Sequence, residues 1–275
     1  MAISNDKQLA FIFGLLGNIV SFLVFLAPIP TFYTIYKNKS SDGYQSIPYV
    51  VALSSASLLL YYGVLKTDAT MIIGINAIGI VIELAYLLFF LTYASNKEKM
   101  YMAKLLLLFN VGGFGVIMAL TVFLLKGWQR INAVGWICAA FNLAVFAAPL
   151  SIMRRVIKTK NVEFMPFTLS FFLSLCAATW FFYGLLVKDM FIALPNTLGF
   201  LFGITQMILY MIYKDGNKKM AETNERNNQQ EVSLDMKKMT SLPGAKLYPT
   251  SLHQPEVAKM YVFSNGKPDE SNDNV

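Results

Sequence analysis

Long apolar stretches alternate with short polar loops from the N-terminus to about residue 213. Each stretch is close to the ~20 residues that a helix needs to cross a hydrocarbon core of ~30 Å. The chain is 56% hydrophobic and 14% charged, which is too apolar for an ordinary soluble domain. We therefore predict an all-α membrane protein with seven transmembrane helices, at about residues 9–34, 47–65, 70–93, 105–125, 131–152, 164–187 and 190–213.

The apolar part of the sequence occurs twice, at a nearly constant offset. Chance does not produce several matched pairs in the same order and spacing, so we interpret them as an internal duplication. Transporters build a central site that opens to either side from a duplicated membrane bundle with paired helix-breaking residues. The matched pairs, 118 to 121 residues apart, are Pro28 with Pro149, Pro48 with Pro166, Gly63 with Gly184 and Asn76 with Asn196.

The fourth apolar segment has no counterpart in the duplication. Two three-helix units joined directly would be inverted relative to each other, whereas one extra span makes them parallel. We therefore expect a 3+1+3 fold, in which two parallel three-helix repeats are joined by one linker helix. The expected units are a first repeat at 1–94, a linker helix with its loops at 95–127, a second repeat at 128–213 and a disordered, polar tail at 214–275.

The positive charge lies in the membrane part of the chain. The formal charge is +7, but the tail from Lys214 onward is neutral, so nucleic acid is not an expected partner. The positive-inside rule predicts an extracellular N-terminus and a cytosolic C-terminus. The loops after segments one, three and five hold nine basic residues (Lys37, Lys39, Lys97, Lys99, Lys104, Arg154, Arg155, Lys158, Lys160), and the other loops and N-terminus hold five (Lys7, Lys66, Lys126, Arg130, Lys188).

The sequence offers few residues that could form a catalytic or metal-binding site. Cys138 and Cys176 fall inside spans, where a small apolar role is preferred to a disulfide or a metal site. The single histidine, His253, lies in the polar tail, so no histidine triad or zinc cluster can be assembled. We expect no enzyme activity, no metal and no cofactor, and the absence of a phosphate-binding loop argues against ATP coupling.

Four prolines lie in the predicted cytosolic half of the bundle. Pro28 and Pro149 come near the inner ends of the first helices, and Pro48 and Pro166 near the inner starts of the second. Proline removes a backbone donor and kinks a helix, which membrane helices tolerate beside a cavity. The alternative for Pro48 and Pro166 is an ordinary helix-start proline.

Asn76, Asn196 and Trp180 converge at one depth of the predicted bundle. Given ~1.5 Å of rise per residue, each lies ~10 Å from the outer helix ends. An amide supplies a hydrogen-bond donor and an acceptor together, and an indole offers a flat, less polar face. These three residues are therefore candidate substrate ligands. The alternative is interhelical hydrogen bonding by buried asparagine.

Three motifs of the second repeat identify a family resemblance: Ala148-Pro149-Leu150-Ser151-Ile152-Met153-Arg154, Val162-Glu163-Phe164-Met165-Pro166-Phe167 and Leu194-Pro195-Asn196. With the 3+1+3 arrangement, their order and spacing closely resemble the plant SWEET sugar facilitators over about residues 8–214. The resemblance implies that the four prolines are gating hinges and that the asparagine pair and tryptophan bind sugar, whose hydroxyls need donors and acceptors and whose C–H face stacks on indole. It also implies further pocket residues one layer deeper: Ser21, Ser55, Asn142, Cys176, Val24 and Val145.

The two valines are typical of the sucrose-exporting branch of that family, so the resemblance favours sucrose. Departures at Asn142 and Cys176, where serine is usual, and at Leu59, where an aromatic occurs, keep a hexose such as glucose as the alternative. We expect facilitative, bidirectional uniport at the plasma membrane, with no ion or ATP coupling. The family also suggests homo-oligomers in contact with membrane lipid. A seven-span receptor fits the helix count but has no need of a duplication.

The sequence leaves the roles of three acidic residues open. Glu83 is well inside a span and has Gly203 at the matched position, so we favour a structural role near the cytosolic edge over proton transport. Asp68 and Asp189 lie in short outer loops, where each is a gate latch or a solvated turn.

Overall fold

The computed structural model describes residues 2–162 and 165–240, and every regular element in these ranges is a helix. Glu163, Phe164 and His253 lie outside the described residues. The elements are α1 (Ala2–Phe25), α2 (Ile29–Asn38), α3 (Ile47–Leu65), α4 (Thr70–Tyr93), α5 (Asn96–Leu105), the π-helix η1 (Leu106–Gly113), α6 (Phe114–Leu124), α7 (Gly127–Val145), α8 (Ala147–Thr159), α9 (Phe167–Leu186) and α10 (Met190–Thr240).

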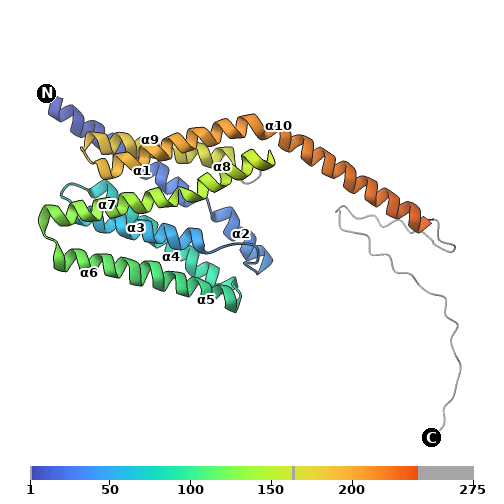
Figure 1. Ribbon diagram of the computed structural model, residues 1–275, viewed down its shortest axis with the longest axis horizontal. Coiled ribbons are helices and arrows are strands. Elements are labelled where there is room, and N and C mark those ends of the chain that lie inside the picture. The colour runs from blue at the N-terminus through green and yellow to red at the C-terminus, as the bar shows by residue number, and fades with distance from the viewer. Residues whose placement is uncertain (1, 163–164, 241–275) are drawn as a thin grey trace, which may run out of the picture. The chain divides into compact units, whose positions relative to one another are not determined.

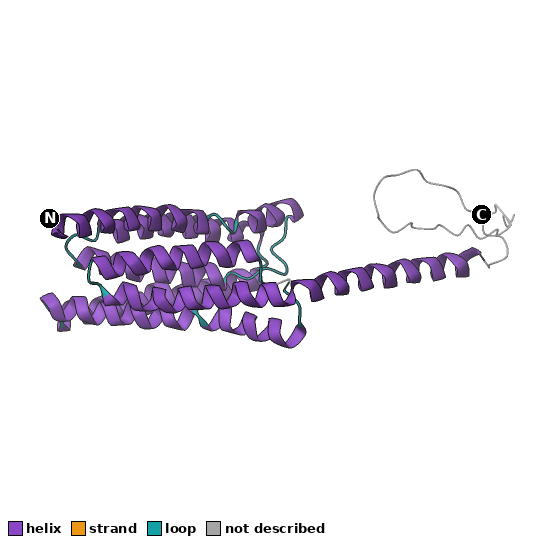
Figure 2. Ribbon diagram, turned by 90° about the horizontal axis from the view of Figure 1, so that it is seen from above, coloured by secondary structure: helices purple, strands orange, loops and turns teal. Residues whose placement is uncertain are grey.

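Seven helical stretches are long and apolar enough to cross a membrane, as predicted. In Figures 1 and 2 they run side by side along one direction. The first span combines α1 with α2, the fourth combines α5, η1 and α6, and the fifth combines α7 with α8. The fourth begins nine residues before the predicted start at 105, at Asn96. A capping box at Ser95 and Glu98 explains this early start, because it supplies partners for the first free N–H groups.

The two repeats share a close approach between their first and third helices. In the first, α4 contacts both α1 and α3. A Cβ placed on Gly14 of α1 would lie 2.8 Å from Met71 of α4, and one on Gly135 of α7 would lie 2.5 Å from the Phe191 ring of α10. These two close approaches are related by the repeat, so glycine lets the first and third helices pack closely in both halves.

The halves meet along two equivalent seams, where α1 packs against α9 and α3 packs against α7. The linker helix covers the second seam, because α3 contacts η1 and α6 contacts α7. A buried cluster that includes Leu58, Tyr62, Val134 and Tyr183 joins the halves at one end of the seams. The fold therefore encloses a space between the repeats and closes it at that end.

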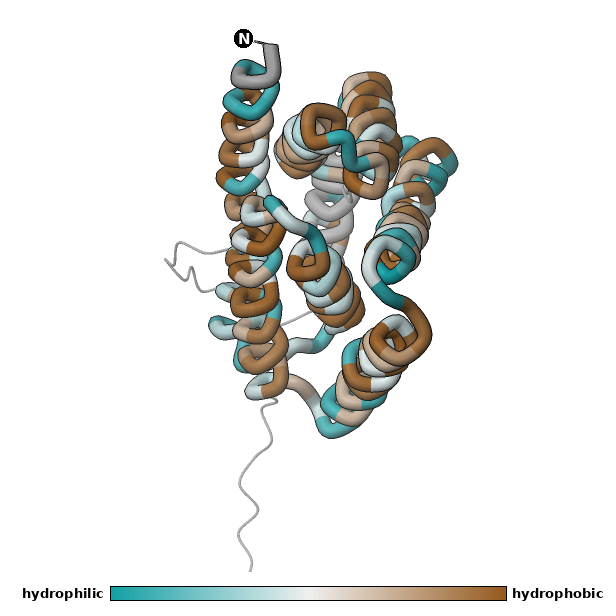
Figure 3. Tube along the Cα trace, turned by 90° about the vertical axis from the view of Figure 1, so that its left-hand side faces the viewer, coloured by the Kyte–Doolittle hydropathy of each residue, from teal (hydrophilic) through white to brown (hydrophobic). Residues whose placement is uncertain are grey.

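The outer surface of the bundle is apolar, as contact with lipid tails requires. Val81, Leu88 and Phe123 are 67%, 64% and 82% exposed. Figure 3 shows hydrophobic turns along the helices and hydrophilic colours in the connecting loops.

The expected disorder of the tail differs from the structure at 214–240, where α10 continues as a helix to Thr240. This part holds several strong helix formers and no proline after Pro195 until Pro243, so nothing local stops the helix. Two units are distinguished, Met1–Glu222 and Thr223–Val275. The rest of the predicted tail, 241–275, lies outside the described residues.

Candidate functional site

A cavity of about 900 Å³ lies between the two repeats, within the range of small-molecule sites. The helices that supply its walls include α1, α3, α4, α7, α9 and α10, so both halves contribute. The structure brings all nine residues of the predicted binding site to this one cavity: Ser21, Val24, Ser55, Asn76, Asn142, Val145, Cys176, Trp180 and Asn196.

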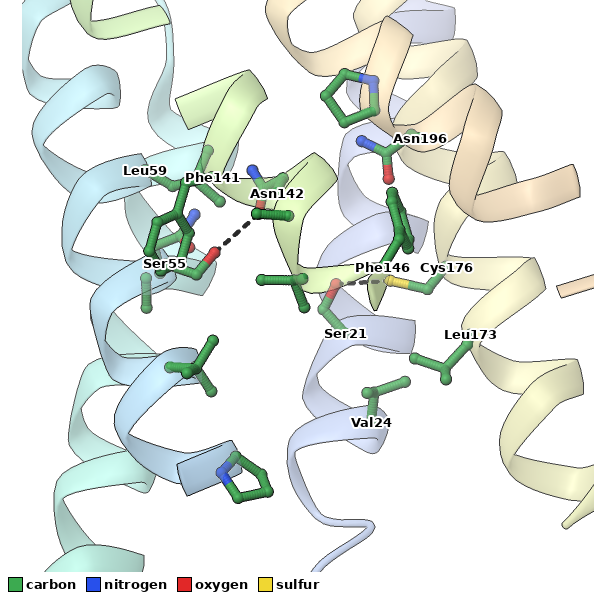
Figure 4. Close-up of a pocket in the computed structure, with 18 of the residues that line it drawn as sticks. Ser21, Val24, Ser55, Leu59, Phe141, Asn142, Phe146, Leu173, Cys176 and Asn196 are labelled. Carbon is green, nitrogen blue, oxygen red and sulfur yellow. Dashed lines mark hydrogen bonds between the residues drawn. The ribbon is translucent and has the colours of Figure 1, made fainter. Parts of the chain in front are cut away.

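Two polar contacts inside the cavity are related by the repeat (Figure 4). Ser21 Oγ of α1 lies 3.1 Å from Cys176 Sγ of α9. On the other seam, the Ser55 hydroxyl of α3 donates to Asn142 Oδ1 of α7 at 2.9 Å. Ser21 matches Asn142 and Ser55 matches Cys176, each 121 residues apart. The two contacts therefore form a polar layer across the cavity, each one joining the two halves.

The asparagine pair lies on the second turns of α4 and α10. Asn76 Nδ2 donates to the Ile72 carbonyl and Asn196 Nδ2 to the Ile192 carbonyl, both at 2.8 Å. In each amide the oxygen and one N–H remain for a ligand. Both hydrogen bonds return to the residue's own helix, so in the described chain interhelical hydrogen bonding does not account for the pair.

Trp180 is fixed by two contacts with α1. Its indole N–H donates to Ser21 Oγ at 2.9 Å, and a Cβ on Gly17 would lie 3.0 Å from its ring. Glycine at this position lets the indole lie against the helix. The matched position on α3 is Leu59, which also lines the cavity. At these two matched positions the cavity thus has an indole on one side and an aliphatic side chain on the other.

The cavity has one open end and one closed end. The open end, which we call the proline end, is lined by Gln45, Ile47 and Pro48 at the start of α3, and all three are exposed. At the opposite end, the lining residues Ile72 and Ile192 are only 4% and 6% exposed. In this conformation a solute reaches the cavity from the proline end.

Asp189 connects the halves at the closed end, which we call the Asp189 end. Its carboxylate accepts a hydrogen bond from Tyr62 Oη at 2.8 Å, forms an ion pair with Lys66 and accepts from the Phe191 N–H at 3.0 Å. Asp189 is 2% exposed, whereas the matched Asp68 is exposed. Asp189 thus makes the contacts between the halves that a gate latch would need, whereas Asp68 lies in a solvated turn.

The four predicted hinge prolines all lie at breaks or ends of helices. Pro28 is the N-cap of α2 and Pro149 is the third residue of α8, so both follow the breaks that divide the first and fifth spans. Pro48 occupies the first turn of α3 and lines the cavity. Pro166 is the N-cap of α9 and is not among the lining residues. It lies 18 residues before Gly184, while Pro48 lies 15 before Gly63, so Pro166 is three residues farther from its matched glycine and precedes α9, whereas Pro48 lies within α3.

Glu83 differs from the expectation that it pairs near a polar edge. It is 4% exposed on α4, and no described residue donates a hydrogen bond to its Oε2. Glu83 lies on the buried face of α4, one turn before the buried Tyr86, and not at a polar edge.

Phe109 and Pro195 also line the cavity and were not predicted as site residues. Pro195 lies inside α10 next to Asn196, and its missing N–H frees a carbonyl one turn earlier. In the sequence, the motif Leu194-Pro195-Asn196 places Pro195 directly before the predicted ligand Asn196 and so points to it. Phe109 belongs to the unduplicated linker helix, so no repeat comparison points to it.

Comparison with known proteins agrees with this geometry. A profile of the family described as "Sugar efflux transporter for intercellular exchange", MtN3_slv, matches residues 11–98 and 132–218, which are the two repeats. The chain is 62% identical over 218 residues to the bidirectional sugar transporter NEC1 of Petunia hybrida, covering 79% of this chain and 82% of that protein. It is 57% identical over 227 residues to the bidirectional sugar transporter SWEET9 of Arabidopsis thaliana, covering 82% and 88%.

A solved structure of a eukaryotic SWEET transporter superposes with a TM-score of 0.72 at 37% identity, covering 76% of this chain and 99% of that one. The profile match covers both repeats, and the relatives align over most of their own length. The internal duplication, the seven spans and the cavity between the halves therefore have a single explanation: this chain belongs to the MtN3/SWEET family of bidirectional sugar transporters.

Proposed function

We propose that this protein is a uniporter that carries sucrose in both directions down its gradient by alternating access. The observation that carries the proposal is the cavity with repeat-related polar pairs, open at the proline end and closed at the Asp189 end. Sugar enters the open end and binds between Asn76, Asn196 and Trp180. The halves then rock about the breaks at Pro28 and Pro149, the Asp189 latch separates, and sugar leaves at the other side.

The chemistry of the cavity wall supports sugar as the ligand. The free amide oxygens and N–H groups of the asparagine pair match hydroxyls that both donate and accept. The serine, asparagine and cysteine layer adds further polar groups, and the apolar remainder of the wall matches the C–H faces of a sugar ring. Loss of any one polar partner in such a desolvated site costs about 1–3 kcal/mol.

Sucrose is proposed over glucose because the wall residues Val24 and Val145 are small. A shorter side chain leaves volume for a disaccharide, and a hexose facilitator of the same fold is the alternative. Asn142 argues in the other direction, because it is larger than serine and occupies part of the same layer.

Uncoupled transport is proposed because the described residues that line the cavity include no carboxylate or histidine. Glu83 is acidic and buried, but it is not among the lining residues. A proton or ion carrier needs a titratable or anionic group that exchanges with the solute path.

We further propose a plasma-membrane location with the proline end in the cytosol. The nine basic residues of the loops at that end support this orientation, which puts the N-terminus outside and the C-terminal part of α10 inside. A homo-oligomer embedded in lipid is also part of the proposal, supported by the broad apolar outer surface.

The direct test is uptake and efflux of labelled sucrose and glucose by cells that lack endogenous sugar carriers. Expression of the full chain is expected to produce sucrose flux in both directions. Glucose flux that exceeds sucrose flux would favour the hexose alternative, and no flux of either sugar would overturn the proposal.

A further inference from the structure

The linker helix contributes one aromatic side chain to the cavity. Phe109 lines the cavity between the repeats although it lies outside both of them. Its neighbours Leu107, Leu108 and Val111 are 64%, 63% and 64% exposed on the outer surface, whereas Phe109 is 39% exposed. The linker helix is therefore more than a connection, because it closes part of the wall.

The π-helix η1 explains how Phe109 reaches this position. A π-helical turn contains more residues than an α-helical turn, so it changes which residues face inward, and such turns are frequent at functional sites. Asn110 Nδ2 reaches the Val50 carbonyl of α3 at 3.5 Å and holds the wide turn against that helix. A Cβ on Gly112 would lie 3.0 Å from the Leu107 carbonyl, so glycine lets this turn form.

The repeat indicates what Phe109 replaces. Ala52 of α3 and Leu173 of α9 are 121 residues apart and both line the cavity. Leu173 lies beside Val24 in Figure 4, where α9 fills the wall of its own seam. On the other seam α3 has only a methyl group at the matched position. The linker helix covers that seam, and among its described residues Phe109 is the one that lines the cavity.

We infer that Phe109 is a specificity-determining residue that sets the width of the sugar cavity near the proline end. Phe109 narrows the cavity at the α3 seam, as Leu173 does at the α9 seam. This inference rests on the proposed function and adds a size limit to it: the parent protein accepts a disaccharide and excludes a trisaccharide. Removing the ring opens volume into which a third sugar unit fits.

The test compares uptake of labelled raffinose, a trisaccharide, with uptake of sucrose and glucose in the same carrier-free cells, corrected for protein at the surface. Phe109→Ala is expected to raise the raffinose-to-sucrose ratio by about five- to a hundredfold, the range that corresponds to relief of ~1–3 kcal/mol of overpacking. The double variant A52L/F109A, which restores an aliphatic side chain on the same seam, is expected to return the ratio toward the parent value. Leu107→Ala, a truncation of an outward-facing neighbour, is the matched control and leaves the ratio unchanged.

A second variant keeps the inference falsifiable if Phe109→Ala does not reach the surface. Ala52→Leu in the parent background crowds Phe109 and is expected to lower sucrose uptake at least fivefold more than glucose uptake. An unchanged sugar ratio in either surface-expressed variant would overturn the inference and leave the proposed function intact. A parent protein that moves neither sucrose nor glucose would instead overturn the proposed function itself.

Discussion

Tyr62 Oη of α3 lies 2.8 Å from Asp189 Oδ2, and this hydrogen bond joins the first repeat to the loop before α10 in the second. Lys66, one turn after Tyr62, forms an ion pair with the same oxygen. Asp189 is 2% exposed, so these partners stabilise a carboxylate that water does not reach. The contact lies at the closed end of the cavity, opposite the open proline end.

Asp189→Asn is expected to shift the protein toward the conformation that is open at the Asp189 end. The change removes the ion pair and weakens the hydrogen bond from Tyr62, at a cost of ~1–3 kcal/mol, or about five- to a hundredfold in the conformational equilibrium. Cys176, in the cavity wall, reports on this shift through its rate of labelling by a membrane-impermeant thiol reagent added outside the cell.

The exposed Asp68→Asn is the matched control for this experiment, because Asp68 occupies the same position of the first repeat. Cys176→Ala identifies any labelling that occurs elsewhere. If Asp189→Asn is labelled at the rate of Asp68→Asn, Asp189 does not hold the closed end.

Asn76→Ala and Asn196→Ala are each expected to reduce sugar flux by about five- to more than a hundredfold. Each removes a donor and an acceptor from a desolvated sugar at ~1–3 kcal/mol per lost partner. Both amides bond only within their own helices in the described chain, so the variants are expected to fold and reach the surface. Thr197→Ala, which changes a residue outside the cavity lining, is the control, and normal uptake by either asparagine variant would remove that residue from the site.

Val24→Leu and Val145→Leu are expected to impair sucrose more than glucose. Each adds a methylene to the cavity wall, and overpacking a fitted site costs ~1–3 kcal/mol, which is about five- to a hundredfold in affinity. Asn142→Ser is expected to move the sucrose-to-glucose ratio the opposite way by restoring space.

The control for this series is Val81→Leu, which makes the same change on the lipid-facing surface. Competition of unlabelled sucrose and glucose against labelled sugar gives the two apparent affinities. Equal sucrose transport by the parent and both leucine variants would contradict the volume argument and the preference for a disaccharide.

Glu83→Gln is expected to leave sugar flux within about twofold of the parent. The amide has nearly the same shape as the carboxyl, and the described residues place no donor at Glu83 Oε2 whose contact would be lost. Uptake measured at several external pH values checks this, because loss of a proton carrier would change both the rate and its pH dependence. A large loss of flux in Glu83→Gln would assign Glu83 a role in transport.

Much of the fold and of the candidate site could be predicted because the duplication presents the same helix pattern and several matched residues in both halves of the chain. The spacing around Pro28 and Pro149 predicted kinks where the structure has helix breaks. The matched Asn76 and Asn196 predicted one cavity with contributions from both halves, and both line it.

The structure differs from the sequence-based predictions at positions that have no counterpart in the repeat, or whose counterpart has different surroundings. Asp68 and Asp189 have equivalent sequence positions, but only Asp189 meets Tyr62 and Lys66 across the seam, a contact that depends on how the halves pack. Phe109 has no counterpart in either repeat, so its place in the cavity wall follows only from the structure, where it lies in the π-helix η1. The expected disorder at 214–240 relied on polarity, whereas local helix propensity continues α10 to Thr240.

Uncoupled, bidirectional transport is tested by the steady-state distribution of a sugar that cells do not metabolise. Cells expressing the protein are given a labelled, non-metabolised sucrose analogue under three conditions: untreated, with a protonophore and after ATP depletion. We expect the internal concentration to rise to the external concentration and stop there under all three conditions, and preloaded cells to release the analogue to the same ratio. Accumulation above the external concentration that collapses with the protonophore or with ATP depletion would contradict it.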